Sequence, residues 1–311
     1  MQTSELKWRC DDGVELPATL FEPDRAGAVL VVAAAMGVPR RYYRAFAADM
    51  AGRGIATVTF DYRGIGEAAP ALPDPRGTSF QDWGRRDLHT VLGQVYARYP
   101  DLPVFLAGHS AGAQIPGLTP LSEKLAGFVF VAGPRPHVSQ DRGSYRIFST
   151  LWWYVLVPLG SLGRWFPARR LRFSSVDVPA GVTAEWGRWA RSPRYLFSPE
   201  HGIDISRYAR LRQPLLAFSF SDDLYTPPAS AEALLSEYPN AQVTRRALRP
   251  AEVGVRAIGH LGFFREALRD TLWAETAEWI GRVRSAECGM RSEGRSGQPH
   301  SALDTPHSAL P

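Results

Sequence analysis

The stretch Leu-Pro-Val-Phe-Leu-Ala-Gly-His-Ser-Ala-Gly at 102–112 decides the fold of this chain. The apolar residues at 104–107 have the pattern of a buried strand, and the residues after the serine can begin a helix. Glycine on either side of Ser110 permits a turn too tight for flanking side chains beside a strained backbone. A strand, a tight turn and a helix in this order predict that Ser110 projects as a nucleophile above a sheet edge. The alternative interpretation is an ordinary strand-to-helix loop that contains a serine.

Strand and helix patterns alternate around this stretch, which predicts a mostly parallel sheet flanked by helices. Residues 7–21 alternate between apolar and polar around an Asp-Asp-Gly turn, which predicts an antiparallel hairpin at the sheet edge. Further strands are predicted at 28–35, 55–60, 125–132, 214–220 and 241–247, and helices at 43–50, 88–99, 229–238 and 264–280.

The alternation stops at 137–207, where aromatic and Arg-rich segments replace it. Insertions of this kind tend to lie at the carboxyl ends of the strands, where ligands bind. We therefore expect a cap over the site, between core parts at 1–136 and 208–284. The apolar run at 147–160 is shorter than the roughly 20 residues that span a bilayer, so we expect it to be buried or to line a pocket. The Ser-, Gly- and Pro-rich segment 285–311 is expected to be a disordered tail.

Composition and charge are those of an ordinary globular protein, with 45% hydrophobic and 22% charged residues. The net charge of +5 comes from arginines scattered among acidic residues rather than from a basic stripe, so we expect no nucleic-acid partner. Cys10 and Cys288 are far apart and show no disulfide framework or metal-binding spacing, which favours a reducing cytoplasm. The sequence shows no phosphate-binding loop, metal-ligand cluster, signal peptide or integral membrane span, so we expect no cofactor and no metal. It carries no signal for an oligomeric state.

A serine nucleophile needs a histidine base and a carboxylate that orients the base, in the chain order serine, acid, histidine. Among seven histidines, only His260 follows the last part of the predicted sheet, with a glycine close by on each side. The alternative role for His260 is a core or capping histidine. Asp222 and Asp223 both follow the predicted strand at 214–220, and either could instead cap the next helix. We expect one of them to orient His260.

Four short motifs together indicate a known family: Gly-His-Ser-Ala-Gly at 108–112, Asp-Tyr-Arg-Gly-Ile-Gly at 61–66, Asp-Leu-Tyr-Thr-Pro at 223–227 and Gly-His-Leu-Gly-Phe-Phe at 259–264. Together, and in this order, they resemble the α/β-hydrolase superfamily, in the branch called serine aminopeptidase-like. The resemblance implies the α/β-hydrolase fold, a mostly parallel central sheet with a helical or irregular cap, and a Ser-His-Asp triad. In that family the acid stands four residues before a proline, which selects Asp223 and leaves Asp222 as the reserve acid.

The resemblance also implies an oxyanion hole made by two backbone N–H groups. One belongs to Ala111, and the other to a loop after an early strand, where Met36 or Gly37 would donate. The sequence has Ala-Met-Gly in that loop rather than the common His-Gly. Ala113 replaces the usual second glycine after the nucleophile, and Pro116 is expected to kink or shorten the following helix.

These features predict a serine hydrolase that cleaves an ester or related acyl bond through an acyl-enzyme intermediate. The aromatic residues of the expected cap favour a small, largely apolar acyl substrate as the partner. An acyltransferase or thioesterase would use the same triad, and a ligand-binding or interaction protein on this scaffold is the non-enzymatic alternative. An aminopeptidase would need an acid for the substrate ammonium group, for which Glu185 is a candidate.

Overall fold

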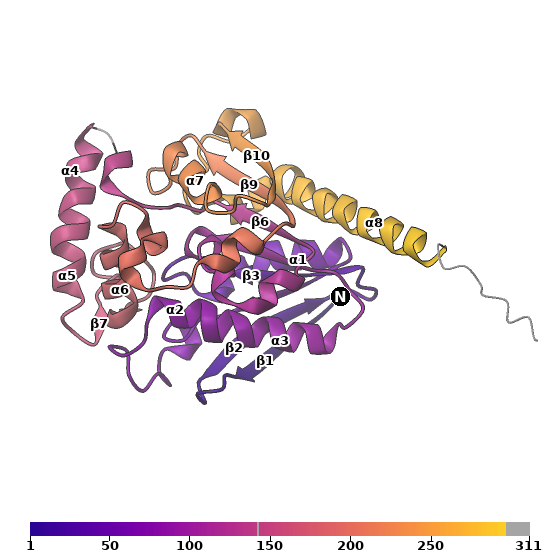
Figure 1. Ribbon diagram of the computed structural model, residues 1–311, viewed down its shortest axis with the longest axis horizontal. Helices are drawn as coiled ribbons and strands as arrows, with labels where there is room; N and C mark the ends of the chain where they lie inside the picture. The colour runs from indigo at the N-terminus through magenta and orange to yellow at the C-terminus, as the bar shows by residue number, and fades with distance from the viewer. Residues whose placement is uncertain (142, 297–311) are drawn as a thin grey trace, which may run out of the picture.

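The computed structural model describes residues 1–141 and 143–296, and its centre is an eight-stranded sheet flanked by helices (Figure 1). The strand order is β1-β2-β4-β3-β5-β6-β9-β10. Strand β2 is antiparallel to both of its neighbours and all other pairs are parallel. The strands are β1 Gln2–Arg9, β2 Glu15–Glu22, β3 Ala28–Ala33, β4 Ile55–Phe60, β5 Val104–His109, β6 Gly127–Val131, β9 Pro214–Phe220 and β10 Gln242–Leu248. The predicted mostly parallel sheet is confirmed.

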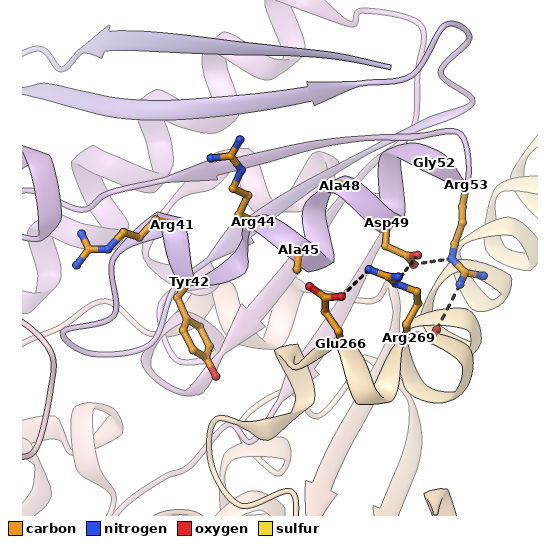
Figure 2. A pocket seen from close by; sticks show the side chains of 10 residues that line it. All are labelled: Arg41, Tyr42, Arg44, Ala45, Ala48, Asp49, Gly52, Arg53, Glu266 and Arg269. Carbon is orange, nitrogen blue, oxygen red and sulfur yellow. Dashed lines mark hydrogen bonds and ion pairs between the residues drawn. The ribbon is translucent and has the colours of Figure 1, made fainter. Parts of the chain in front are cut away.

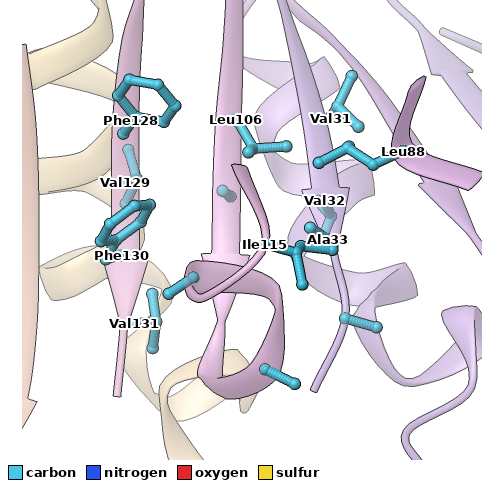
Figure 3. Packing of buried hydrophobic residues seen from close by; sticks show 14 of the residues in the cluster. Val31, Val32, Ala33, Leu88, Leu106, Ile115, Phe128, Val129, Phe130 and Val131 are labelled. Atoms are coloured by element: carbon cyan, nitrogen blue, oxygen red, sulfur yellow. The ribbon is translucent and has the colours of Figure 1, made fainter. Parts of the chain in front are cut away.

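The four central strands, β4, β3, β5 and β6, are buried along their whole length. Strands covered on both faces have continuous apolar runs rather than alternating patterns, which is why the sequence predicted them clearly. Val31, Leu106 and Phe128 lie side by side across β3, β5 and β6, and Ile115 packs into the same cluster (Figure 3). This core supports the end of β5, from which Ser110 follows.

The helices cover the sheet or lie in the insertion between β6 and β9. They are α1 Arg44–Gly52, α2 Phe80–Asp82, α3 His89–Arg98, α4 Gly143–Leu151, α5 Val157–Gly160, α6 Ala180–Ala190, α7 Pro228–Leu235 and α8 Ala274–Ser296. A π-helical turn, Trp152–Leu156, joins α4 to α5 so that they form one continuous helix. No helix in the described ranges is long and apolar enough to cross a bilayer.

The expected helix after Ser110 is replaced by three short 3-10 turns between residues 110 and 124. Pro116 has no backbone N–H, so it cannot continue an α-helical hydrogen-bond ladder. The carbonyl oxygen of Ala113 instead accepts a hydrogen bond of 2.8 Å from the buried Tyr238 hydroxyl. The turn that follows the nucleophile is therefore held by side chains rather than by a regular helix.

Residues 137–207, here called the insertion, contain α4, α5 and α6 together with the antiparallel pair β7 (Trp165–Phe166) and β8 (Val178–Pro179). These elements gather at one side of the sheet (Figure 1). At the other end of the chain, α8 continues to Ser296, so the helix extends past residue 285, where the tail was predicted to begin. The rest of that predicted tail, 297–311, lies outside the described residues.

Candidate active site

Ser110 stands on a strained turn directly after β5, with a φ of +51°. This left-handed conformation is uncommon for a residue with a side chain. A Cβ atom on Gly112 would lie 2.0 Å from the carbonyl oxygen of Ala33, and one on Gly108 would lie 2.7 Å from that of Gly112. Only glycine fits at either position, so the two glycines permit the turn that presents the Ser110 side chain.

Asp223 and His260 meet in the structure, with 2.8 Å between Oδ2 of the aspartate and Nδ1 of the imidazole. The Asp223 side chain is fully buried, and its Oδ1 accepts hydrogen bonds from the backbone N–H groups of Tyr225 at 2.8 Å and Thr226 at 3.0 Å. A carboxylate fixed in this way orients the ring and makes Nδ1 the donor, which leaves Nε2 free to accept a proton.

Asp222, the reserve acid, forms no hydrogen bond with the His260 ring in the part of the chain that the structure describes. Its Oδ2 accepts hydrogen bonds from the backbone N–H groups of Ile258 at 2.8 Å and Gly259 at 3.0 Å. These bonds fasten the loop that ends in His260. The two neighbouring aspartates therefore have different roles. Asp223 orients the imidazole, and Asp222 holds the backbone of the two residues that precede His260.

His109, the variable residue of the Gly-x-Ser-x-Gly motif, forms a buried hydrogen-bonded chain that the sequence did not predict. Its Nε2 lies 2.9 Å from the carbonyl oxygen of His260, and its Nδ1 lies 2.8 Å from the Tyr43 hydroxyl. Since a carbonyl only accepts, Nε2 carries the proton and Nδ1 accepts from Tyr43. The Tyr43 oxygen in turn accepts a 2.9 Å bond from the N–H of Ala35, next to the expected oxyanion loop.

Burial lowers the pKa of His109 to about 3, with a smaller contribution from the nearby His260. The imidazole is therefore neutral at physiological pH, as the chain of hydrogen bonds requires. The chain ties the backbone of His260 to the loop that contains Met36, across the turn that contains Ser110. In the sequence, the signal for this hydrogen-bonded chain was a polar residue, His109, at the end of an otherwise apolar strand.

The three candidate oxyanion donors lie close to the site and are unengaged. Within residues 1–141 and 143–296, no group accepts a hydrogen bond from the N–H of Met36, Gly37 or Ala111. Gly37 has a φ of +68°, and its carbonyl accepts a hydrogen bond from the Ser174 hydroxyl in the insertion. The assignment of the oxyanion hole to these groups stays a prediction.

A cavity of about 580 Å³ contains Ser110 and His260 in its wall. No hydrogen bond joins their side chains in the described part of the chain, as is common for a nucleophile and base without substrate. Met36 also lines this cavity. Eight of the 28 residues that line it are Phe, Tyr or Trp, and six of these come from the insertion: Tyr145, Phe148, Trp152, Trp153, Phe173 and Trp186.

A second hollow, of about 810 Å³, lies on the surface beside α1 (Figure 2). Four of its six charged side chains are paired with one another: Asp49 with Arg53 at 2.7 Å and Arg269 at 3.5 Å, and Arg269 with Glu266 at 3.2 Å. Its lining contains no serine, cysteine or histidine. This hollow therefore offers no serine or cysteine nucleophile and no histidine base, although its volume is the larger.

Glu185, the candidate ammonium ligand, is not among the residues that line the aromatic cavity. It is buried and accepts hydrogen bonds from Gln81, through the backbone N–H at 3.0 Å and the side-chain amide at 2.7 Å. It therefore links the insertion to α2. In the described ranges, no cluster of three or more His, Cys, Asp or Glu side chains is arranged to hold a metal ion.

Comparison with known proteins supports the same architecture. The model of a family described as serine aminopeptidase, S33, matches residues 24–143. A carboxyl esterase from Bacillus coagulans is 17% identical with a TM-score of 0.61, covering 91% of this chain and 99% of its own. A soluble variant of monoglyceride lipase from Saccharomyces cerevisiae is 13% identical with a TM-score of 0.66, covering 91% and 95%. An esterase from Thermogutta terrifontis is 15% identical with a TM-score of 0.57, covering 91% and 100%. No curated protein matches the sequence.

Proposed function

This chain is an α/β hydrolase by fold, and on that premise we propose that it is a serine hydrolase that cleaves esters of small, largely apolar acyl compounds. Ser110 is the nucleophile, His260 the general base and Asp223 the residue that orients the base. The observation that carries the proposal is the Asp223–His260 hydrogen bond, together with the cavity that His260 and the strained Ser110 both line.

The reaction proceeds in two halves. In the first, His260 Nε2 takes the proton of Ser110 Oγ as Oγ bonds to the substrate carbonyl carbon, and the resulting oxyanion is held by backbone N–H groups. The C–O bond to the alcohol then breaks and His260 returns the proton to the leaving oxygen. In the second half, His260 activates a water molecule, which releases the acid and restores Ser110.

We assign the oxyanion hole to the N–H of Ala111 together with that of Met36 or Gly37. Each donor is unengaged among the described residues, and loss of one such donor typically costs about 10²- to 10³-fold in rate. The insertion acts as a cap in this proposal, because it supplies 14 of the 28 residues that line the cavity, six of them Phe, Tyr or Trp. The buried free thiol of Cys10 fits the expectation of a cytoplasmic protein.

Hydrolysis of p-nitrophenyl esters of increasing acyl length tests the proposal. Since each buried methylene contributes about 0.8 kcal/mol, kcat/KM should rise with chain length until the cavity is filled. Ser110→Ala should lower kcat by at least about 10³-fold, whereas Ser285→Ala, at an exposed serine of α8, should leave it unchanged.

The two aspartates supply a matched comparison. Asp223→Asn should lower kcat by about 10³- to 10⁴-fold, because the amide no longer fixes the required tautomer of His260. Asp222→Asn keeps an acceptor for the two N–H groups and should cost less than about tenfold. Equal effects of the two substitutions would contradict the assignment. Product analysis with an added alcohol or with a thioester distinguishes acyl transfer and thioester cleavage from ester hydrolysis.

A further inference from the structure

The continuous helix of α4, Trp152–Leu156 and α5 leaves an apolar stripe uncovered. Its members recur at intervals of three to five residues, and their exposed fractions are 75% for Ile147, 48% for Leu151, 50% for Tyr154 and 60% for Leu159. Such spacing places them along one side of a helix. Leu162, in the turn that follows α5, is 68% exposed. The expectation that the run 147–160 is buried or lines a pocket was therefore wrong for most of its residues. The inner side carries Trp152, Trp153 and Val157, which are buried.

The stripe belongs to a larger apolar surface that reaches the cavity. Of the twelve large hydrophobic side chains exposed in the described part of the chain, eight lie between residues 147 and 171. Phe148 and Leu171 belong to this group and also line the cavity, as do the exposed Tyr225 and Leu261. A contiguous exposed apolar surface of this kind marks an interaction site on a soluble domain.

The charge of the same region is one-sided. Residues 142–176 include six arginines and no aspartate or glutamate, whereas the rest of the chain carries 30 basic and 31 acidic residues. The net charge of +5 therefore comes from this segment, and the expectation of arginines scattered among acidic residues does not hold here. The described arginines of the segment are exposed, and none forms an ion pair with a described residue: Arg146, Arg164, Arg169, Arg170 and Arg172.

The loop that carries Arg169 and Arg170 packs beside the helix. Phe166 and Phe173, which flank these arginines in the chain, both contact Trp152, with ring centroids 5.9 and 5.1 Å away. Since Trp152 lies on the inner side of the helix, these contacts place the loop with Arg169 and Arg170 beside the helix that carries the stripe. We call this combined surface, residues 146–172, the cap face.

We propose that the cap face binds the surface of an anionic lipid bilayer. Apolar side chains on one side of a helix enter the boundary between headgroups and acyl chains, and flanking cationic side chains attract anionic headgroups. A second copy of the chain is a poor occupant, since symmetric pairing would bring two sets of unpaired arginines together. If the proposed function holds, the cavity mouth beside Phe148 and Leu171 receives apolar esters directly from the bilayer.

Vesicle flotation with the full chain tests this inference without reference to catalysis. The probes are vesicles of phosphatidylcholine alone and vesicles of phosphatidylcholine mixed with phosphatidylglycerol. We expect binding to the mixed vesicles at least about tenfold tighter than to the neutral ones, and weaker binding as salt is added. Equal binding to both vesicles, or binding to neither, would overturn the proposal.

Two triple variants separate the apolar and charged contributions. Ile147→Ser/Leu151→Ser/Leu162→Ser should weaken binding by at least about tenfold. Arg146→Gln/Arg169→Gln/Arg170→Gln should weaken it by about a hundredfold, because each arginine near an anionic surface contributes about fivefold. The matched control is Arg25→Gln/Arg85→Gln/Arg256→Gln, which removes three exposed arginines elsewhere and should bind within about twofold of the native chain.

Thermal unfolding by circular dichroism confirms that each variant is folded before its binding is compared. Unchanged binding of either cap-face variant contradicts the proposal. Sedimentation measures whether the native chain forms a dimer. A dimer that is lost in Ile147→Ser/Leu151→Ser/Leu162→Ser would assign the cap face to a second copy of the chain instead. Lipid binding without ester hydrolysis would leave this inference standing and remove the proposed function.

Discussion

The neighbouring residues Asp222 and Asp223 take different roles because their carboxylates accept hydrogen bonds from different groups. Asp223 orients the His260 ring, while Asp222 accepts the N–H groups of the preceding loop. The sequence predicted that an acid at 222 or 223 would meet His260, since each follows a strand that ends at one sheet edge, and Asp223 does so. The role of His109 was not predicted, because it depends on contacts with Tyr43 and with the His260 carbonyl, both distant in sequence.

The buried neutral His109 gives the protein a pH-dependent stability. Burial lowers the pKa of His109 from its ordinary value of 6.5 to about 3. Between pH 6.5 and 3, the histidine is therefore protonated in the unfolded chain but not in the folded chain. The stability contribution is thus present above pH 6.5 and is lost as the pH falls toward 3, at about 1.4 kcal/mol per pH unit.

Urea denaturation of native protein and of His109→Asn at several pH values between neutrality and about pH 5 measures this dependence. The variant should be less stable at neutral pH and should lose stability on acidification with a slope smaller by about one proton. Identical slopes for the two proteins would show that His109 takes up its proton in the folded state.

At the scale of elements, sequence patterns were sufficient to predict all eight strands of the large sheet. Alternation predicted the N-terminal hairpin, and continuous apolar runs predicted the buried central strands. The turns after Ser110 could not be predicted so well. Pro116 indicated that the helix would be disturbed, but the Tyr238 hydroxyl that donates to the Ala113 carbonyl comes from a distant loop. The exposed stripe of the α4–α5 helix was not predicted, because a continuous apolar run does not show which side of the helix packs against the protein.

The loop after β4 is held by a buried ion pair rather than by catalytic contacts. Arg63 Nε lies 2.6 Å from Asp87 Oδ1, and both side chains are almost inaccessible. Arg63 also pairs with Asp12, at 2.6 Å, in the turn of the N-terminal hairpin. Burial raises the pKa of Asp87 to about 6 despite this partner, which reflects the cost of keeping its charge away from water.

Arg63→Met should therefore lower the free energy of unfolding by about 3–5 kcal/mol, because it leaves the Asp87 carboxylate buried without its partner. Arg86→Met is the matched control, since Arg86 also pairs with Asp12 but is 42% exposed; it should cost less than about 1 kcal/mol. Chemical denaturation measures both values. Similar losses for the two variants would contradict a special role for the buried pair.

For the whole molecule, net positive charge and apolar exposure are concentrated in one segment, residues 142–176, while the rest of the chain is nearly neutral. The sheet core supports the Ser110 turn, and the insertion contributes aromatic side chains to the cavity and arginines to the cap face. One segment thus combines the wall of the proposed acyl site with the proposed lipid-binding surface. The sequence revealed the unusual composition of this segment, but only the fold shows that its helix lies at the cavity mouth.

The central claim is that Ser110 is a nucleophile activated by His260. A fluorophosphonate reacts covalently with such a serine, and peptide mapping by mass spectrometry identifies the modified residue. We expect the native protein to be modified at Ser110, Ser110→Ala to remain unmodified, and unfolded protein to lose the reaction. Absence of modification in the folded protein, or modification that persists in Ser110→Ala, would contradict the account.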